Sequence, residues 1–168
     1  MSERSDFTFN GGVFTHKVMP NGETRTRVKF GDGLVSTVAR MPEWTWNDGL
    51  PWQEAHSHKG LTEVYRLISG WAIVGKLHPQ FADRNAPWYL GVAMTMFENQ
   101  VLAFDPNEVH IVLLGPRATM HTTLTGVPKG NPERNENDWW PYLELDEYVR
   151  RWDAEGLKSA IIRAGGVP

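Results

Sequence analysis

The sequence contains no cysteine. This absence excludes disulfide bonds, thiolate metal ligands and cysteine nucleophiles. No apolar run approaches the ~18 residues that a membrane span requires, and no long basic run indicates a nucleic-acid partner. The first residues, Met-Ser-Glu-Arg-Ser-Asp, are polar and charged, unlike a secretory signal. We therefore expect a cytoplasmic protein that has neither nucleic acid nor a membrane as its partner.

The chain has 168 residues and a net charge of −3, which suits one domain with a sizeable core. Short segments rich in apolar and β-branched residues alternate with turn signals that contain glycine, proline and asparagine. The predicted strands are Val13–Met19, Thr24–Phe30, Leu34–Met41, Gln53–His58, Glu63–Ser69, Trp71–Leu77, Trp88–Phe97, Val101–Phe104, Ile111–Leu114 and Ala118–Thr125. Regularly spaced short strands predict an all-β sandwich or barrel.

The two ends of the chain differ from this pattern. Residues 1–12 are polar, so we expect a weakly docked N-terminal tail. In the last part of the chain, Leu145, Tyr148 and Val149 follow one another at helical spacing. We therefore expect residues 127–168 to form an extension with one or two short helices, which covers the barrel or a neighbouring subunit.

Two further features have alternative interpretations. In the Thr24–Phe30 strand, Arg25, Arg27 and Lys29 share one face, which is most simply a solvated surface; an oligomer contact is the alternative. The loop before Gln53 is rich in tryptophan, and its indoles either line a ligand pocket or pack over the end of the barrel. Trp52, from this loop, and Tyr89 are our candidate substrate-binding residues.

Three histidines and one glutamate form the strongest candidate site. His56 and His58 are one residue apart, so they point to the same side of a strand. Glu63 follows a short turn, and His110 lies far downstream after a proline-containing turn. Imidazoles and a carboxylate are costly to gather in a barrel interior unless they share a cation. We therefore expect one divalent transition metal per chain, and the ligand types suit Fe, Mn, Ni, Co, Cu or Zn.

This pattern resembles the two motifs of the cupin superfamily. The first motif matches with one extra residue after its first glycine, and reads Gly49, His56, His58, Glu63 and Gly70. In the second motif, Asp105 takes the proline position, Asn107 the glycine position and His110 the histidine position, while Leu114 replaces the final asparagine. Asparagine tolerates the left-handed turn that glycine usually makes there.

The resemblance implies a fold, a site and an assembly. The fold is the double-stranded β-helix, or jelly-roll barrel, over residues 13–126, with the short helical extension behind it. The metal ligands are His56, His58, Glu63 and His110, although Glu63 acts as a base instead in some cupins. Cupins often pair through sheet edges, so we expect a homodimer.

Function is more open, because cupins host many unrelated reactions. The first hypothesis is an isomerase or epimerase that acts on a small polar, sugar-type metabolite through a metal-stabilised enediolate. The segment Thr37–Pro42, the histidine pair and Glu63-Val64-Tyr65 together resemble the cupin-type phosphoglucose isomerases loosely. Tyr65 and His121 are the candidate catalytic residues besides Glu63. The alternatives are an iron-dependent dioxygenase, a lyase, or a ligand-binding cupin without enzymatic activity.

Overall fold

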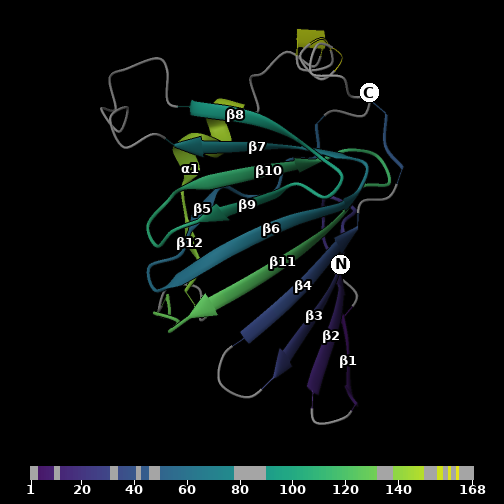
Figure 1. Ribbon diagram of the computed structural model, residues 1–168, viewed down its shortest axis with the longest axis vertical. Coiled ribbons are helices and arrows are strands. Elements are labelled where there is room, and N and C mark those ends of the chain that lie inside the picture. The colour runs from purple at the N-terminus through teal and green to yellow at the C-terminus, as the bar shows by residue number, and fades with distance from the viewer. Residues whose placement is uncertain are drawn as a thin grey trace.

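The computed structural model describes residues 4–9, 12–30, 34–40, 43–45, 50–77, 90–131 and 138–149, with the single positions 155, 156, 159 and 162. Over these residues the chain is mostly β-structure, arranged in two antiparallel sheets with a short helix beside them (Figure 1). The all-β prediction is therefore confirmed. No helix in the described part of the chain is long and apolar enough to cross a membrane.

The larger sheet has seven strands and the smaller sheet has five. In spatial order, the larger sheet contains β1 (Arg4–Phe9), β2 (Gly12–Val18), β3 (Thr24–Phe30), β4 (Leu34–Arg40), β11 (Thr119–Gly126), β6 (Leu61–Ser69) and β9 (Val101–Phe104). The smaller sheet contains β12 (Trp140–Pro141), β5 (His56–Ser57), β10 (His110–Leu114), β7 (Trp71–Leu77) and β8 (Leu90–Phe97).

Strand boundaries differ from the expectation mainly at two places. Residues 4–9, expected to belong to a weakly docked tail, form β1 and pair with β2 from Arg4↔Lys17 to Phe9↔Gly12. Backbone pairing along a neighbouring strand therefore outweighs the polar composition of this segment. The expected strand over Gln53–His58 is shorter, because regular pairing is confined to β5, although the Gln53 amide still donates to the Val112 carbonyl.

Two apolar clusters cover the two faces of the smaller sheet. The first lies between the sheets, where Tyr65 and Leu67 of β6 meet Val112 and Leu114 of β10. The second lies on the opposite face of the smaller sheet and contains Ile111 and Leu113 of the same strand. All five residues of β10 are buried, which is the expected pattern for a central strand that is covered on both faces.

The helix α1 (Leu143–Val149) covers the outer face of the smaller sheet (Figure 1). Its Leu145 and Val149 are buried in the second cluster. Its Asp146 accepts a hydrogen bond from the Ala55 amide at 2.7 Å, one residue before β5. This helix therefore supports β5, the strand that carries His56.

Two turns of the motifs adopt the left-handed conformation. Gly70, between β6 and β7, has φ 80°, and a Cβ atom there would lie 3.0 Å from the Ala118 Cα. Asn107, which takes the glycine position of the second motif, has φ 72°, a conformation that asparagine tolerates. Both turns bring their following strands back along the barrel, and the second one delivers His110.

Candidate metal centre

The four predicted metal ligands meet inside the barrel. His56 lies in β5 and pairs directly with His110 at the start of β10. His58 follows β5, and Glu63 projects from β6 in the other sheet. One donor atom from each residue lies within 4.8 Å of all the others, and all four residues are buried. The cluster thus joins the two sheets, and its donor set is one that can hold a transition metal.

The Glu63 carboxylate is the centre of this cluster. Its Oε2 atom lies 2.8 Å from Nε2 of His110, 3.1 Å from Nε2 of His58 and 3.6 Å from Nε2 of His56. The Tyr65 hydroxyl donates to the same oxygen at 3.1 Å. Three ring nitrogens and a carboxylate oxygen therefore face a common point.

The opposite ring nitrogens are all anchored to backbone carbonyls. Nδ1 of His56 lies 2.9 Å from the Glu54 carbonyl, and Nδ1 of His110 lies 2.9 Å from the Glu108 carbonyl. Nδ1 of His58 lies 2.5 Å from the Asp138 carbonyl. Because carbonyl oxygens only accept hydrogen bonds, each Nδ1 carries a proton, so Nε2 is the nitrogen that can donate to Glu63 when protonated or offer its lone pair to a cation when not. Lone pairs that converge on a carboxylate need a shared cation, so the residues fit a metal ion.

Asp138 organises the turn that carries His58. Its carboxylate accepts hydrogen bonds from the amides of Lys59 at 2.8 Å and Gly60 at 2.7 Å, while its own carbonyl holds the His58 ring. Asp138 is fully buried and has φ 55°. Next to it, Trp139 stacks on His56 with ring centroids 5.0 Å apart. Sequence analysis missed both residues, since they lie in the extension about 80 positions after His58 and match no motif there.

Burial and mutual contact shift the pKa values of the cluster. Burial, aided by the neighbouring His110, lowers the pKa of His56 to about 4. Burial alone would raise the pKa of Glu63, but hydrogen bonds from the three histidines hold it well below its usual range. Burial alone would lower the pKa of His58, but its hydrogen bond to Glu63 raises it. Burial and the Glu63 charge raise the pKa of Tyr65 well above its usual range. The carboxylate is thus ionised and the phenol protonated at neutral pH.

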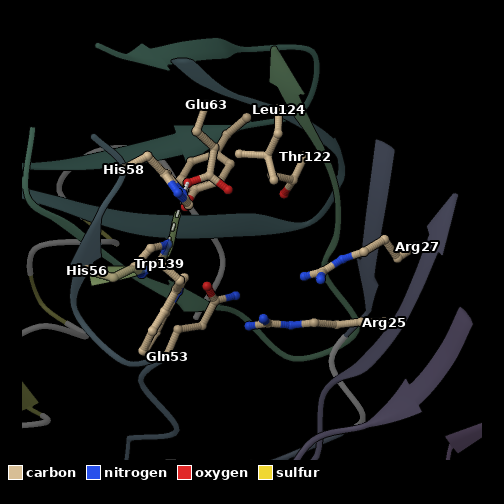
Figure 2. Close-up of a pocket in the computed structure, with 10 residues that line it drawn as sticks. Arg25, Arg27, Gln53, His56, His58, Glu63, Thr122, Leu124 and Trp139 are labelled. Atoms are coloured by element: carbon tan, nitrogen blue, oxygen red, sulfur yellow. Dashed lines mark hydrogen bonds and ion pairs between the residues drawn. The ribbon is translucent and has the colours of Figure 1, made fainter. Parts of the chain in front are cut away.

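A pocket opens onto His56, His58, Glu63 and Tyr65 (Figure 2). The rest of its wall consists of Arg25, Arg27, Gln53, Thr122, Leu124 and Trp139. Most of these groups are polar or charged. A cavity volume of ≈ 50 Å³ gives room for an ion with a few waters, or for the reacting end of a small molecule. The arrangement favours a small polar ligand.

Arg25 and Arg27 both line the pocket, which the expectation of a solvated basic face did not include, although Arg27 is exposed as expected. The reason is the strand register. Arg27 pairs with Thr37, Thr37 pairs with Thr122, and Thr122 pairs with Tyr65, so this row of residues crosses the larger sheet on one face. Tyr65 points into the barrel, and Arg27 therefore does so as well. Only the order and register of the strands, which a single sequence does not show, reveal this.

Two other candidate residues, His121 and Trp52, lie away from the cluster. His121 is exposed, and its neighbours Thr122 and Leu124 line the pocket instead, so alternation turns the imidazole to the outer face of β11. Trp52 is buried in the second apolar cluster, which agrees with the alternative that the indoles of the tryptophan-rich loop pack against the barrel. Tyr89 lies outside the described residues. Trp139 is the aromatic residue that lines the pocket in the described part of the chain, besides Tyr65.

Comparisons with known proteins agree with this architecture. The sequence matches no family model and no curated protein. Among solved structures, KdgF from Halomonas sp. superposes with a TM-score of 0.50 at 10% identity, covering 71% of this chain and 89% of that one. An RmlC-like cupin from Shewanella frigidimarina superposes with a TM-score of 0.50 at 14% identity, covering 78% of this chain and 97% of that one. The chain therefore has the fold of the cupin superfamily, as its two motifs indicated.

Proposed function

We propose that this protein is a metal-dependent enzyme that moves a proton between adjacent carbons of a small polar, sugar-type metabolite, as an isomerase or epimerase does. The observation that carries the proposal is the buried cluster of His56, His58, Glu63 and His110, which opens onto a polar pocket. A divalent cation held there would polarise a substrate carbonyl and so acidify the neighbouring C–H bond.

The protein itself supplies two groups for proton transfer. Glu63 is ionised, so it serves either as a ligand or as the base that takes the proton from carbon. Tyr65 keeps its proton and can donate a hydrogen bond to the substrate oxygen as negative charge develops on it. With the three histidines committed to the metal, these are the titratable groups that remain in the pocket besides the arginines. His121 is exposed and does not contribute to this chemistry.

The test is solvent exchange. Protein purified without a metal-affinity tag is incubated in D2O with a panel of aldoses, ketoses and sugar acids, and proton NMR follows the carbon next to the carbonyl. Proton transfer predicts deuterium incorporation at that carbon. Tyr65→Phe should keep its metal and lose about 10²- to 10⁴-fold of the exchange rate. Tyr142→Phe is the matched control, because Tyr142 packs in the second apolar cluster outside the pocket. No exchange with any substrate would contradict the proposal.

An iron-dependent dioxygenase is the alternative, because the ligand set of three histidines and a glutamate also suits iron. The pocket is less apolar than a dioxygenase for aromatic substrates would favour, since Trp52 lies in the core and two arginines line the pocket. Iron near one per chain with oxygen uptake in metabolite extract would favour the dioxygenase. Binding without turnover would favour a non-enzymatic cupin. A cytoplasmic homodimer remains our proposal for location and assembly.

A further inference from the structure

The wall of the pocket across from the metal cluster is basic. Arg25 and Arg27 extend from β3 into the pocket, facing the side that carries His56 and His58 (Figure 2). The two arginines are two residues apart on one strand, so they project to the same side. Thr122 adds a hydroxyl to this wall. A ligand in the pocket would therefore contact the histidine cluster with one end and the guanidinium groups with the other.

Arg25 is held in place by a buried acid. The Glu23 side chain is fully buried, and its Oε2 accepts hydrogen bonds from Nε of Arg25 at 2.8 Å and from Nη2 at 2.6 Å. The other carboxylate oxygen accepts from Nε2 of Gln53 at 2.5 Å. Glu23 therefore takes two of the five N–H groups of Arg25 and fixes the plane of its guanidinium. A group fixed in advance loses little conformational entropy when it binds a ligand.

The charges of the pocket favour an anion. Its lining contains two arginines and one carboxylate, Glu63, which already faces the three histidines, and Glu23 behind the wall balances the charge of Arg25. A divalent cation at the cluster would give the pocket a net positive charge. Arg25 is half-buried, while Arg27 is exposed and stands at the mouth of the pocket. Guanidinium groups in such positions pair with planar carboxylate or with phosphate oxygens.

We propose that Arg25 and Arg27 form an oxyanion subsite, which binds the carboxylate or phosphate group of the substrate and directs its carbonyl end to the histidine cluster. This inference rests on the proposed function and narrows its substrate class to acidic metabolites, such as hydroxy- or oxo-acids. Glu23 and Gln53 act as positioning residues for Arg25. The subsite also explains why an acidic side chain is buried at the end of a β-hairpin, where it would otherwise be costly.

Binding of simple probes tests the subsite. Isothermal titration calorimetry measures the affinity of glycolate and of inorganic phosphate for the protein as purified and after metal removal, with ethylene glycol as the neutral probe. Arg27→Gln should weaken binding of the preferred anion by about 10- to 100-fold, as the loss of one charge-assisted contact predicts. Arg25→Lys keeps the positive charge but loses the planar guanidinium with its paired N–H donors, and it should weaken anion binding less than Arg27→Gln does. Arg66→Gln is the control, because Arg66 is exposed on β6 and absent from the pocket lining.

The outcomes separate this inference from the proposed function. Saturable glycolate binding that depends on Arg27 supports a carboxylate subsite, and the same result with phosphate supports a phosphate subsite. Unchanged affinity in Arg27→Gln, an equal loss in Arg66→Gln, or no binding of either anion by the wild type would overturn the subsite. If the anion binds through Arg27 but no carbon exchange occurs in D2O, the subsite stands and the proposed reaction fails.

Discussion

Single residues outside the ligand set hold the metal centre in shape. Each ligand histidine is oriented by a backbone carbonyl, and the strand positions of those carbonyls depend on side chains further away. Asp138 is the clearest example, because it both orients His58 and fastens the turn behind it. Partners of this kind commonly affect metal affinity almost as strongly as the ligands do.

Replacing Asp138 by Ala should weaken both folding and metal binding. The amides of Lys59 and Gly60 lose a charged acceptor, which lowers the free energy of unfolding by about 1–3 kcal/mol because both hydrogen bonds are only partly buried. The backbone carbonyl that holds the His58 ring remains, but the turn behind His58 is no longer fastened, so metal affinity should fall about 10- to 100-fold. Urea unfolding and competition with a chelator measure the two effects. Asp138→Asn, which keeps an acceptor and tolerates positive φ, should lose less; wild-type metal affinity in the Ala variant would refute the role.

The metal-free protein should lose stability as the pH falls from 6.5 to 4. The pKa of His56 drops from 6.5 to about 4 on folding, so between pH 6.5 and 4 the unfolded chain binds a proton at this residue and the folded protein does not. This difference lowers the free energy of unfolding by on the order of 3 kcal/mol over that range. His58 does not offset the loss, because its raised pKa makes a contribution that is complete below pH 6.5. Urea unfolding of chelator-treated protein at several pH values between 6.5 and 4 measures this loss of stability.

His56→Gln separates this effect from general acid destabilisation. The variant lacks the imidazole, so its stability should fall less steeply than that of the wild type between pH 6.5 and 4. Parallel curves for the two proteins would show that the His56 pKa is not lowered by burial.

At the scale of elements, α1 supports the site from behind. Its buried side chains complete the apolar cluster on the outer face of the smaller sheet, and Asp146 holds the strand before His56. The helix is only seven residues long, so its stability comes from this packing and not from its own hydrogen bonds.

Leu145→Ala should therefore destabilise the protein by about 2–5 kcal/mol, the usual result of opening a cavity at a fully buried leucine. Leu143→Ala is the matched control on the same helix, because Leu143 is 63% exposed and should change stability by less than about 0.5 kcal/mol. Thermal or urea unfolding distinguishes them. Equal effects of the two substitutions would mean that α1 does not dock as described.

Much of the element structure could be predicted from the sequence, because apolar alternation and turn residues are local signals. Thr24–Phe30, Trp71–Leu77 and Val101–Phe104 have the predicted boundaries. The four predicted ligands could be named because their spacing is short-range, apart from His110. The pocket wall could not be predicted, since Arg25 faces inward only through pairing that spans the larger sheet, and Asp138 reaches His58 across 80 positions.

At the scale of the whole molecule, the cluster joins the two sheets through polar groups. His56 and His110 come from the smaller sheet and Glu63 from the larger one. A bound ion would therefore cross-link the two sheets and raise the free energy of unfolding. The long N-terminal hairpins extend the larger sheet and leave β1 at its edge. Such an edge is where the predicted homodimer would pair.

Metal content is the most direct test of the central claim. Elemental analysis is made on tag-free wild type, His110→Ala and His121→Ala after equal exposure to a mixture of transition metals. The cluster predicts about one metal ion per chain in the wild type and in His121→Ala, whose exposed imidazole lies outside the site. It predicts a loss of most of that metal in His110→Ala. A metal-free wild type, or an unchanged metal content in His110→Ala, would contradict the assignment of these four residues as a metal centre.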